Sequence, residues 1–477
     1  MMRLLLWFVA ISCFAAQTDS AIYAARRARL QATLSGAAII VPGRNTVGQA
    51  GETQLKQEPN FWYLTGVESP FAILVITPRA TVLFLPTEYQ FASGQYPGVD
   101  PGYRRAPWNR PIGRLYPGPA AVRATGVTAT YAIDDFMKEL PGVLKDCSTV
   151  YLPLDGRKLY SPPGLTTPVP IESQISNSIA KQLPGKTISN VTPYIARMRL
   201  IKDETEIRAL RRAATISGDG LIQAMRAIHP GVTDRSIAGV MEAVWKREGS
   251  PRAAFAPVVN SGENAMHFFP LIAERYDMDR VMQAGELVFI DYGAAEVDMY
   301  ASDICRTFPV SGVYTAEQRK YYQIVLDAQE AAIGAMKPGV MMVDVVKTAA
   351  AVYRKNGLES YEDISKMGED RVWGLMPSPT HYLARGLGLV SYSPSGGGVR
   401  DLGHHIGLEV QDSRDYSMPL APGMVVTIEP KIYIPEKKIA IMIEDMILVT
   451  ATGAENLVPD TPKRVEDIER VMGGGRR

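Results

Sequence analysis

The first third of the chain combines a helical pattern with short apolar runs. A basic amphipathic segment, YAARRARLQATL, follows Ile22 and predicts a helix. Four runs rich in β-branched or aromatic residues come after it and predict strands: AAIIV, FWYLTGV, AILVIT and TVLFLP. Strands mixed with helical stretches in this way are typical of a mixed α/β domain.

Prolines and glycines become frequent between Pro141 and Pro193, as in LYSPPGLTTPVP. These residues interrupt regular structure, so this stretch is expected to approach a domain boundary. Within it, SQISNSIAKQL could still form a helix of the first domain. We expect the second domain to begin near Ser189.

Apolar residues recur at helical spacing in this second domain. Four of them lie along one face of the segment that starts at Lys202: Ile207, Leu210, Ala214 and Leu221. The pattern stops at a Pro-Gly pair, residues 230–231, where the helix is expected to end. A capping box that starts at Thr315 predicts another helix, which ends before Pro338.

Two segments of the second domain resemble each other. PGVTDRSIAGVMEAVWKREG spans residues 230–249 and PGVMMVDVVKTAAAVYRKNG spans residues 338–357. Two unrelated amphipathic helices could look alike by chance. A duplication instead predicts a pseudo-twofold domain with a cleft between its halves, and a site that draws residues from both halves.

The 477 residues are enough for two or three domains at roughly 150 residues each. We therefore expect an α/β (α+β) protein. A mixed α/β domain would span residues 21–188, the duplicated domain residues 189–470, and a disordered tail residues 471–477.

Residues 1–20 are expected to be a signal peptide. MMRLLLWFVAISCFAA joins one early Arg to an apolar stretch too short to span a bilayer, and small and then polar residues follow. This pattern predicts an exported protein, periplasmic or secreted, with no membrane span in the mature chain. AISC also resembles a lipoprotein box, which would make Cys13 a lipidated N-terminus, and an uncleaved anchor is a third alternative.

Charge and cysteine content exclude two other classes of protein. Lys plus Arg number 51 and Asp plus Glu number 50, so the net charge of +1 offers no field that would attract a polyanion. A nucleic-acid partner is therefore not expected. The mature chain would retain only Cys147 and Cys305, which are too few for a disulfide scaffold.

Four acidic residues stand in apolar surroundings. A buried carboxylate costs several kcal/mol unless it is paired, hydrogen-bonded or bound to a metal. A single acid at a strand end is more often a solvated turn residue, but four acids flanked by β-branched or aromatic residues favour a shared partner. They are Asp291 in LVFID, Asp303 in YASDICRTF, Glu429 in VVTIE and Glu444 in IAIMIED.

The segment DLGHHIGLEVQD adds an imidazole. Gly403 and Gly407 bracket His404 and His405 and allow backbone or ligand to approach closely, and the chain has only 5 histidines. Four carboxylates and one imidazole form an oxygen-rich set that suits manganese, magnesium or a pair of zinc ions. Two metals roughly 3.5–4 Å apart could share these carboxylates, so the sequence predicts a dinuclear centre.

These residues stand in motifs that resemble a known family. FIDYG, SDICRTFPV, GHHIGLEV, GMVVTIEPKIYIP and IEDMILVT are similar to the motifs of the dinuclear metallopeptidases of the pita-bread fold. Among these, the chain most resembles the Xaa-Pro aminopeptidases (aminopeptidase P) and the related Xaa-Pro dipeptidases. The resemblance extends to their N-terminal domain through LKQEPNFWYLTGVESPFAILVI, and to NSGENAMHF, the segment that bears an active-site histidine, here His267.

The resemblance implies a metal centre and an activity. Asp291, Asp303, His404, Glu429 and Glu444 would ligate two divalent metals, usually Mn2+, with Zn2+ or Co2+ as alternatives. A water that bridges both metals would attack the amide bond between an N-terminal residue and a following proline. Glu429 would hold a metal with one oxygen and move a proton with the other, and His267 would hydrogen-bond the substrate. Homodimers or homotetramers are common in the family.

Three positions depart from the family pattern. Gln411 stands where a second catalytic histidine is usual, and it can donate a hydrogen bond but cannot become cationic. Met442 replaces an arginine, and the spacing between Asp291 and Asp303 is one residue longer than usual, which a bulge near Ala294 could absorb. His405 is expected to pack rather than to bind metal.

These departures leave alternatives open. The chain could be a metal-binding pita-bread protein with weakened or lost peptidase activity. It could also be an Xaa-Pro dipeptidase, or hydrolyse another C–N or ester bond. The short segment between Pro430 and Glu444 resembles the aminopeptidase type more closely.

Overall fold

The computed structural model describes residues 9–44, 56–87, 115–154, 169–267, 278–292, 296–358, 391–392, 399–400, 402–412, 416–434 and 437–474. They form two compact units, Met1–Ala196 and Arg197–Arg477, and the division falls inside α8 (Thr192–Leu200). The expected boundary, between residues 188 and 189, instead falls inside β6 (Thr187–Asn190), a strand of the first unit. The expected tail overlaps the last helix, α15 (Val465–Gly474), and its final residues lie outside the described ones.

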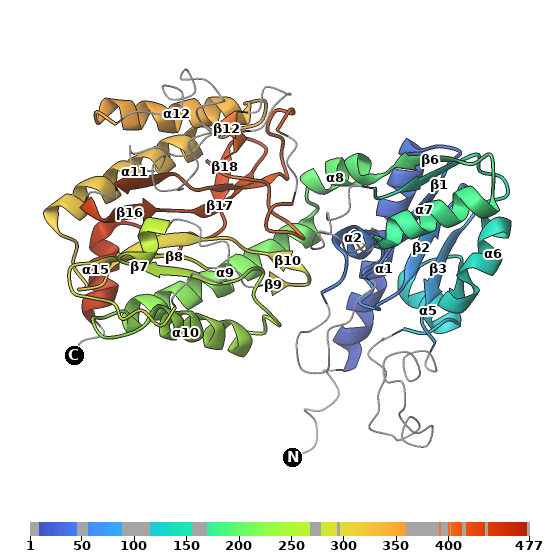
Figure 1. Cartoon of the computed structure of the whole chain (residues 1–477), viewed down its shortest axis with the longest axis horizontal. Helices are drawn as coiled ribbons and strands as arrows, with labels where there is room; N and C mark the ends of the chain where they lie inside the picture. The colour runs from blue at the N-terminus through green and yellow to red at the C-terminus, as the bar shows by residue number, and fades with distance from the viewer. Residues whose placement is uncertain are drawn as a thin grey trace, which may run out of the picture. The chain divides into compact units, whose positions relative to one another are not determined.

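The first unit is built on a six-stranded sheet in the order β4-β3-β2-β1-β5-β6 (Figure 1). Its strands are β1 (Ala38–Pro42), β2 (Ile73–Ile76), β3 (Thr81–Leu85), β4 (Ala129–Ala132), β5 (Thr149–Leu152) and β6 (Thr187–Asn190). The β1–β2 and β2–β3 pairs are antiparallel and the other pairs are parallel, so the predicted mixed α/β domain is confirmed.

Helices connect and cover this sheet. They are α1 (Val9–Thr33), α2 (Pro59–Thr65), α5 (Pro119–Thr125), α6 (Phe136–Val143) and α7 (Ile171–Gln182), with a 3-10 turn, η1 (Ile133–Asp135). Leu140 of α6 and Ile179 of α7 join the sheet residues Ile40, Val75 and Val150 in one fully buried core. The segment SQISNSIAKQL therefore does form a helix of the first unit.

One predicted strand is wrong. FWYLTGV lies mostly in helix α2, not in a strand. Glu58 caps this helix by accepting a hydrogen bond from the Phe61 amide, Pro59 occupies its first turn, and Gly66 ends it in the left-handed conformation. Start and stop signals at both ends therefore outweigh the β preference of the aromatic residues between them.

The N-terminal helix α1 runs through the region of the expected cleavage site, from Val9 to Thr33. Export and lipidation at Cys13 stay predictions, because nothing in the described structure tests them. Among the described helices, none combines the length and apolar character that crossing a membrane requires.

The second unit repeats one arrangement of elements. The pair α9 (Glu204–Ala227) and α10 (Asp234–Arg247) precedes an antiparallel sheet in the order β11-β8-β7, formed by β7 (Val258–Ser261), β8 (Leu287–Asp291) and β11 (Cys305–Pro309). The pair α11 (Ala316–Ala335) and α12 (Met342–Lys355) precedes another, in the order β14-β17-β18, formed by β14 (Val425–Ile428), β17 (Asp445–Val449) and β18 (Ala454–Asn456).

The two similar segments form equivalent helices. Helix α10 begins at the fifth residue of its copy, Asp234, and α12 begins at the fifth residue of its own, Met342. Both end at the eighteenth residue, Arg247 and Lys355. The duplicated order of elements predicted from the sequence is therefore confirmed. The predicted capping box at Thr315 is confirmed as well.

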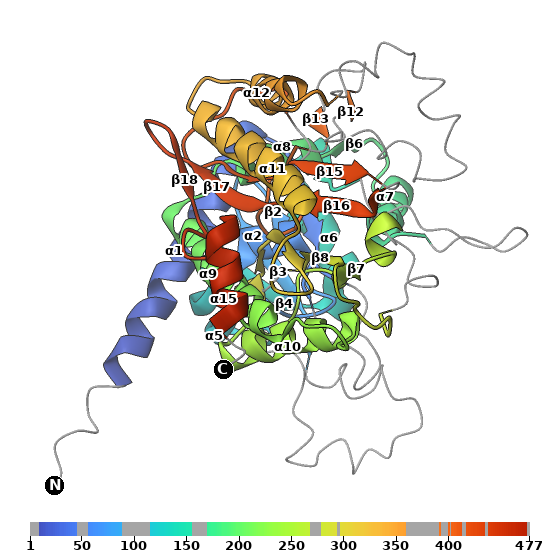
Figure 2. The ribbon, with the colours of Figure 1, turned by 90° about the vertical axis from the view of Figure 1, so that its left-hand side faces the viewer.

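Shorter elements complete the second unit. The hairpin of β15 (Lys431–Ile434) and β16 (Ile439–Met442) packs against α11, and Figure 2 shows its two strands next to that helix. Strand β16 also packs on β8 and β11. The remaining elements are η2 (Asn264–His267), β9 (Glu296–Val297), β10 (Tyr300–Ala301), β12 (Ser391–Tyr392) and β13 (Val399–Arg400).

Two helical glycines test the packing of α9 on α10. A methyl group at Gly220 of α9 would collide with the Trp245 indole of α10, whereas one at Gly239 of α10 would meet no atom within 4 Å. We expect Gly220→Ala to lower the free energy of unfolding by about 1–3 kcal/mol through overpacking. Gly239→Ala should raise it by about 0.5–1 kcal/mol through helix propensity. Urea unfolding measures both, and equal effects of the same sign would contradict this packing.

Candidate metal centre

The five expected metal ligands come from both halves of the second unit. Asp291 ends β8 and Asp303 lies between β10 and β11, in the first half. Glu429 follows β14 and Glu444 lies between β16 and β17, in the second half, as does His404. All four acids are at most 8% exposed. The four acids that the sequence singled out are therefore shielded from water in the fold.

One backbone bridge joins the two halves at this point. The amide of Glu444 donates to the Cys305 carbonyl at 2.9 Å, and Cys305 stands opposite Asp291 in the β11–β8 ladder. Arg306, fully buried, donates from Nη1 to the Glu444 carbonyl at 2.6 Å and from Nη2 to Asp445 Oδ1 at 2.6 Å. The bridge and this arginine together hold Glu444 beside the end of β8.

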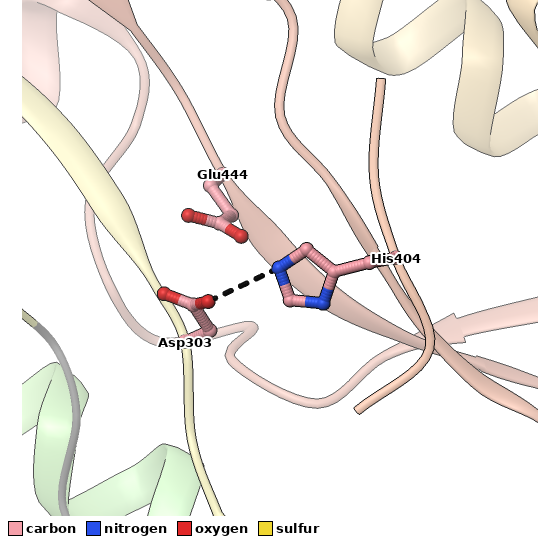
Figure 3. A group of neighbouring side chains, drawn as sticks. All are labelled: Asp303, His404 and Glu444. Atoms are coloured by element: carbon pink, nitrogen blue, oxygen red, sulfur yellow. Dashed lines mark ion pairs between the residues drawn. The ribbon is translucent and has the colours of Figure 1, made fainter. Parts of the chain in front are cut away.

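Three of the expected ligands could bind one ion. Ligand atoms of Asp303, His404 and Glu444 all lie within 4.8 Å of one another, and Figure 3 shows these side chains turned toward each other. His404 Nε2 lies 3.3 Å from Asp303 Oδ2. His404 Nδ1 donates to the His405 carbonyl at 3.3 Å, which directs Nε2 to the acids, as a metal-binding histidine requires.

Asp291 and Glu429 extend this group. Asp291 and Asp303 share a hydrogen bond, and the charges of Asp303 and Glu429 both act on Asp291. Glu429 Oε1 lies 3.8 Å from His404 Nε2. The structure thus brings together all five residues that the sequence nominated as ligands.

The acids repel one another in the absence of cations. Burial, together with the charges of Asp303 and Glu429, raises the pKa of Asp291 well above its ordinary value. Burial and the same two neighbours raise the pKa of Glu444 well above its ordinary value. Burial also raises the pKa of Asp303, although His404 opposes this effect. Divalent cations would remove this repulsion.

Unpartnered oxygens support a fit to metal ions. Among the described residues, Asp291 Oδ1, Asp303 Oδ1 and Glu444 Oε1 are buried without a hydrogen-bond partner. Buried oxygens normally have a partner. Asp303 and Glu444 lie beside the imidazole of His404, whose Nε2 is directed to the acids. The donor set of carboxylate oxygens with one imidazole therefore fits hard or borderline divalent ions.

The segment that carries His404 is fastened along β14. His404 accepts a hydrogen bond from the Thr427 amide at 2.8 Å, and its own amide donates to Thr427 Oγ1 at 3.0 Å. A side chain at Gly403 would collide with the Thr427 backbone, and one at Gly407 with the Asp412 carboxylate. The close approach predicted for these two glycines is thus confirmed, to the backbone at one and to a carboxylate at the other.

The far end of this segment is held by a buried ionic group. Asp412 accepts hydrogen bonds from Arg199 and, at 3.2 Å, from Lys202 Nζ. Burial raises the pKa of Asp412, but the charges of Arg199 and Lys202 outweigh burial and hold it below its ordinary value. Arg199 also donates to Glu409 Oε2 at 3.0 Å. The end of α8 (Thr192–Leu200) and the turn that follows it therefore anchor the histidine segment.

Another buried acid supports the turn that carries His267. Asp234 Oδ2 accepts from Asn264 Nδ2 at 2.8 Å and from the Ser261 amide at 3.3 Å, and Asn264 opens η2, whose last residue is His267. Burial raises the pKa of Asp234 to about 6, although hydrogen bonds from Ser261 and Asn264 oppose it. The side chain of His267 lies outside the described part of the chain, so its role stays a prediction.

The remaining positions that the sequence singled out have different outcomes. His405 is buried and stacks on Tyr416, so it packs as predicted. Met442 is fully buried in an apolar cluster with Phe289 and Cys305. Gln411 is exposed, and its catalytic role stays a prediction. The bulge expected near Ala294 lies outside the described residues.

Sequence reasoning missed the residues that support the ligands. Arg199, Lys202 and Asp412 act across more than 200 positions, and no local pattern signals such a group. Lys431 also went unnoticed, although it is 3% exposed and its Nζ lies 3.1 Å from Glu429 Oε2. A lysine directly after Glu-Pro and before an apolar strand was the available signal.

The duplicated domain and its buried acids and imidazole define the class of protein, a metallohydrolase with an oxygen-rich centre. Comparison with known sequences agrees with this class. Metallopeptidase family M24 matches residues 208–451, and the N-terminal domain of aminopeptidase P matches residues 23–151. The chain belongs to metallopeptidase family M24, and the resemblance inferred from the sequence is confirmed.

Relatives match along nearly the whole chain. The Xaa-Pro aminopeptidase of Escherichia coli (strain K12) is 29% identical over 489 residues, which cover 95% of this chain and 97% of that protein. Xaa-Pro aminopeptidase 3 of Mus musculus is 27% identical and covers 87% and 76% of the two chains. The structure of a putative aminopeptidase P from Bacillus anthracis superposes with a TM-score of 0.75 at 26% identity, covering 96% and 99%.

A zinc-substituted aminopeptidase P of Escherichia coli in complex with product superposes equally well, with a TM-score of 0.75 at 26% identity. It covers 96% of this chain and 99% of that one. The predicted fold of an N-terminal α/β domain and a catalytic domain is therefore confirmed. A requirement for divalent metal follows from the family, whereas the identity of the ion does not.

Removal of the Asp412 charge tests the anchoring of His404. Asp412→Asn leaves Arg199 and Lys202 buried without their carboxylate, so we expect the free energy of unfolding to fall by about 3–5 kcal/mol. Metal affinity should fall with it, because the His404 segment loosens. Glu409→Gln is the control: its partly exposed carboxylate also binds Arg199, and its loss should cost about 0–1 kcal/mol. Equal costs for both variants would contradict the anchor.

A pH series tests the burial of Asp234. Its pKa of about 6 lies above the value of about 4 in an unfolded chain. The proton that it binds therefore stabilises the fold at low pH, and this contribution disappears as the pH rises through 6. Between about pH 4 and 7, the stability of the wild type relative to Asp234→Asn should fall by about 1–3 kcal/mol.

Asp279→Asn supplies the control for this series. Asp279 is exposed, and its hydrogen bond to Arg235 holds its pKa below the ordinary value. Its contribution is therefore lost as the pH falls, the opposite sign. Urea unfolding at each pH measures both variants. A wild-type advantage over Asp234→Asn that grows with pH would show that Asp234 is not buried in this way.

Proposed function

We propose that this chain is a metal-dependent Xaa-Pro aminopeptidase, which hydrolyses the amide bond between an N-terminal residue and a following proline. The observation that carries the proposal is the convergence of four buried acids and one imidazole from both halves of a family M24 domain. The relatives that match most of its length bear the same activity in their names.

The metal ions would be held by Asp291, Asp303, His404, Glu429 and Glu444. We propose two Mn2+ ions, with Zn2+ or Co2+ as alternatives. When bound, they supply Lewis-acid polarisation of the scissile carbonyl and lower the pKa of a water molecule. The family membership and the donor set support divalent metals in general, and the choice of manganese rests on the sequence resemblance.

The side chains contribute orientation and proton transfer. Glu429 presents Oε1 to His404 and Oε2 to Lys431, so one oxygen of the carboxylate would bind metal while the other would accept and release a proton. His267, at the end of η2, would donate to the substrate oxygen on which charge develops. An amide before proline has no N–H, so a protease that must bind that hydrogen cleaves it poorly.

We also propose an exported homo-oligomer, a dimer or tetramer. The N-terminal pattern of residues 1–20 supports export, with lipidation at Cys13 as the alternative. N-terminal analysis of the exported chain distinguishes the two, because a lipidated protein begins with Cys13.

Three peptides test the activity. We expect the Mn2+-loaded protein to release the first residue of an X-Pro-Y tripeptide and to leave X-Ala-Y intact. Cleavage confined to X-Pro dipeptides would identify a dipeptidase instead. If neither proline peptide is cut while metal binds tightly, and Gln411→His alone creates activity, the native chain is a silenced relative.

Glu429→Gln tests the proton-transfer role. The substitution keeps the size of the side chain but removes its basicity, so kcat should fall about 10²–10⁴-fold. Glu455→Gln is the matched control, because Glu455, on β18, is a partly exposed glutamate that forms an ion pair with Arg211. It should leave kcat unchanged. Retention of full activity in Glu429→Gln would overturn the assignment.

A further inference from the structure

Lys431 is a buried lysine beside the expected metal ligands. It opens β15 two residues after Glu429 and is 3% exposed. Lysine is almost never fully buried unless it is paired, because its ammonium loses its hydration. Its Nζ donates to Glu429 Oε2 at 3.1 Å. A buried lysine at this place therefore needs an explanation that involves the acids.

The two oxygens of Glu429 face different partners. Oε2 binds the Lys431 ammonium at 3.1 Å, and Oε1 lies 3.8 Å from His404 Nε2, on the side of the other ligands. A carboxylate that is free to rotate could present either oxygen, or both, to a metal. The lysine bond restricts that choice to Oε1.

Lys431 also supplies positive charge to the whole acidic group. Its charge acts on Asp291 and on Glu444, where it opposes the repulsion from neighbouring carboxylates. Four ionised carboxylates carry a charge of about −4, and a fixed ammonium reduces it whether or not metal is bound. Such a cation lowers the repulsion without occupying a ligand position.

The strand register relates this lysine to a departure noted in the sequence. Lys431 pairs directly with Met442 across the β15–β16 hairpin. Side chains opposite each other in an antiparallel pair lie on one face, about 5 Å apart. The family resemblance implies an arginine at position 442. Lys431, directly opposite Met442 on the neighbouring strand, therefore supplies a positive charge at the same point along the hairpin.

We propose that Lys431 is a positioning residue for the hydrolysis, which holds Glu429 Oε2 so that Oε1 faces the other proposed ligands, and which provides the positive charge that Met442 lacks. This inference rests on the proposed function. It differs from a purely structural role, in which Lys431 would only keep the hairpin folded and the ligands assembled.

Substitutions within the hairpin test the proposal. We would compare Lys431→Met, Lys431→Arg and a swap that combines Lys431→Met with Met442→Lys, which keeps the composition and moves the charge across one rung. Lys186→Met is the control, because Lys186 Nζ also donates two hydrogen bonds, to the Leu144 and Cys147 carbonyls of the first unit. Each protein is assayed for kcat and KM on X-Pro-Y, and Mn2+ affinity is measured by calorimetry.

In Lys431→Met we expect kcat at saturating Mn2+ to fall about 10–100-fold, as for other residues that orient metal ligands, with KM nearly unchanged. Mn2+ should bind as tightly as in the wild type or more tightly, because a repelling charge is gone and Glu429 can offer both oxygens. Lys431→Arg and the swap should each recover most of the lost kcat. Lys186→Met should retain wild-type kcat.

Wild-type kcat in Lys431→Met would overturn the proposal. Mn2+ affinity that falls together with kcat, without recovery in Lys431→Arg or the swap, would assign the lysine a structural role and also overturn it. If Lys431→Met does not fold, the swap is assayed in its place. A kcat near that of the wild type then supports the proposal, and a low kcat overturns it. If the wild type cleaves no X-Pro peptide, the proposed function fails, and the Mn2+ affinity of Lys431→Met alone tests the lysine: tighter or equal binding supports its position, and weaker binding contradicts it.

Discussion

Electrostatic repulsion among buried carboxylates is the constraint on which the second unit depends. Asp291, Asp303 and Glu444 have pKa values raised by burial and by the charges of neighbouring carboxylates, and three of their oxygens have no partner among the described residues. Such a group costs several kcal/mol unless cations neutralise it. Divalent ions are the cations that its oxygens and imidazole would bind, and the Lys431 ammonium adds a fixed charge beside them.

The fold brings these groups together by joining two similar halves. The Cys305–Glu444 bridge connects the sheet of one half to that of the other, and Arg306 holds the Glu444 backbone. The Thr427 contacts fix His404 along β14, and Asp412 ties the end of its segment to Arg199 of α8 and to Lys202. Each half supplies only part of the proposed ligand set, so the centre forms only where the two halves meet.

The sequence predicted what local patterns encode, namely the α/β class, the repeated helices and the four acids and one imidazole that the structure brings together. Acids in apolar surroundings are visible one segment at a time, so Asp291 and Glu429 could be nominated without coordinates. The apolar pattern did not predict that FWYLTGV is helical, because the Glu58 cap and Gly66 determine the conformation of that segment. It also missed Asp412 and Lys431, since their roles depend on partners brought near by folding and on the strand register.

The number of metal ions that the purified chain binds is the decisive measurement for the dinuclear centre. The protein would be stripped with a chelator, reloaded with Mn2+, passed through a desalting column and analysed for metal and protein together. We expect about two ions per chain, because five ligands with shared carboxylates suit a metal pair. Asp303→Asn should lower that number. A folded wild type that retains no ion, or only one, would contradict the account.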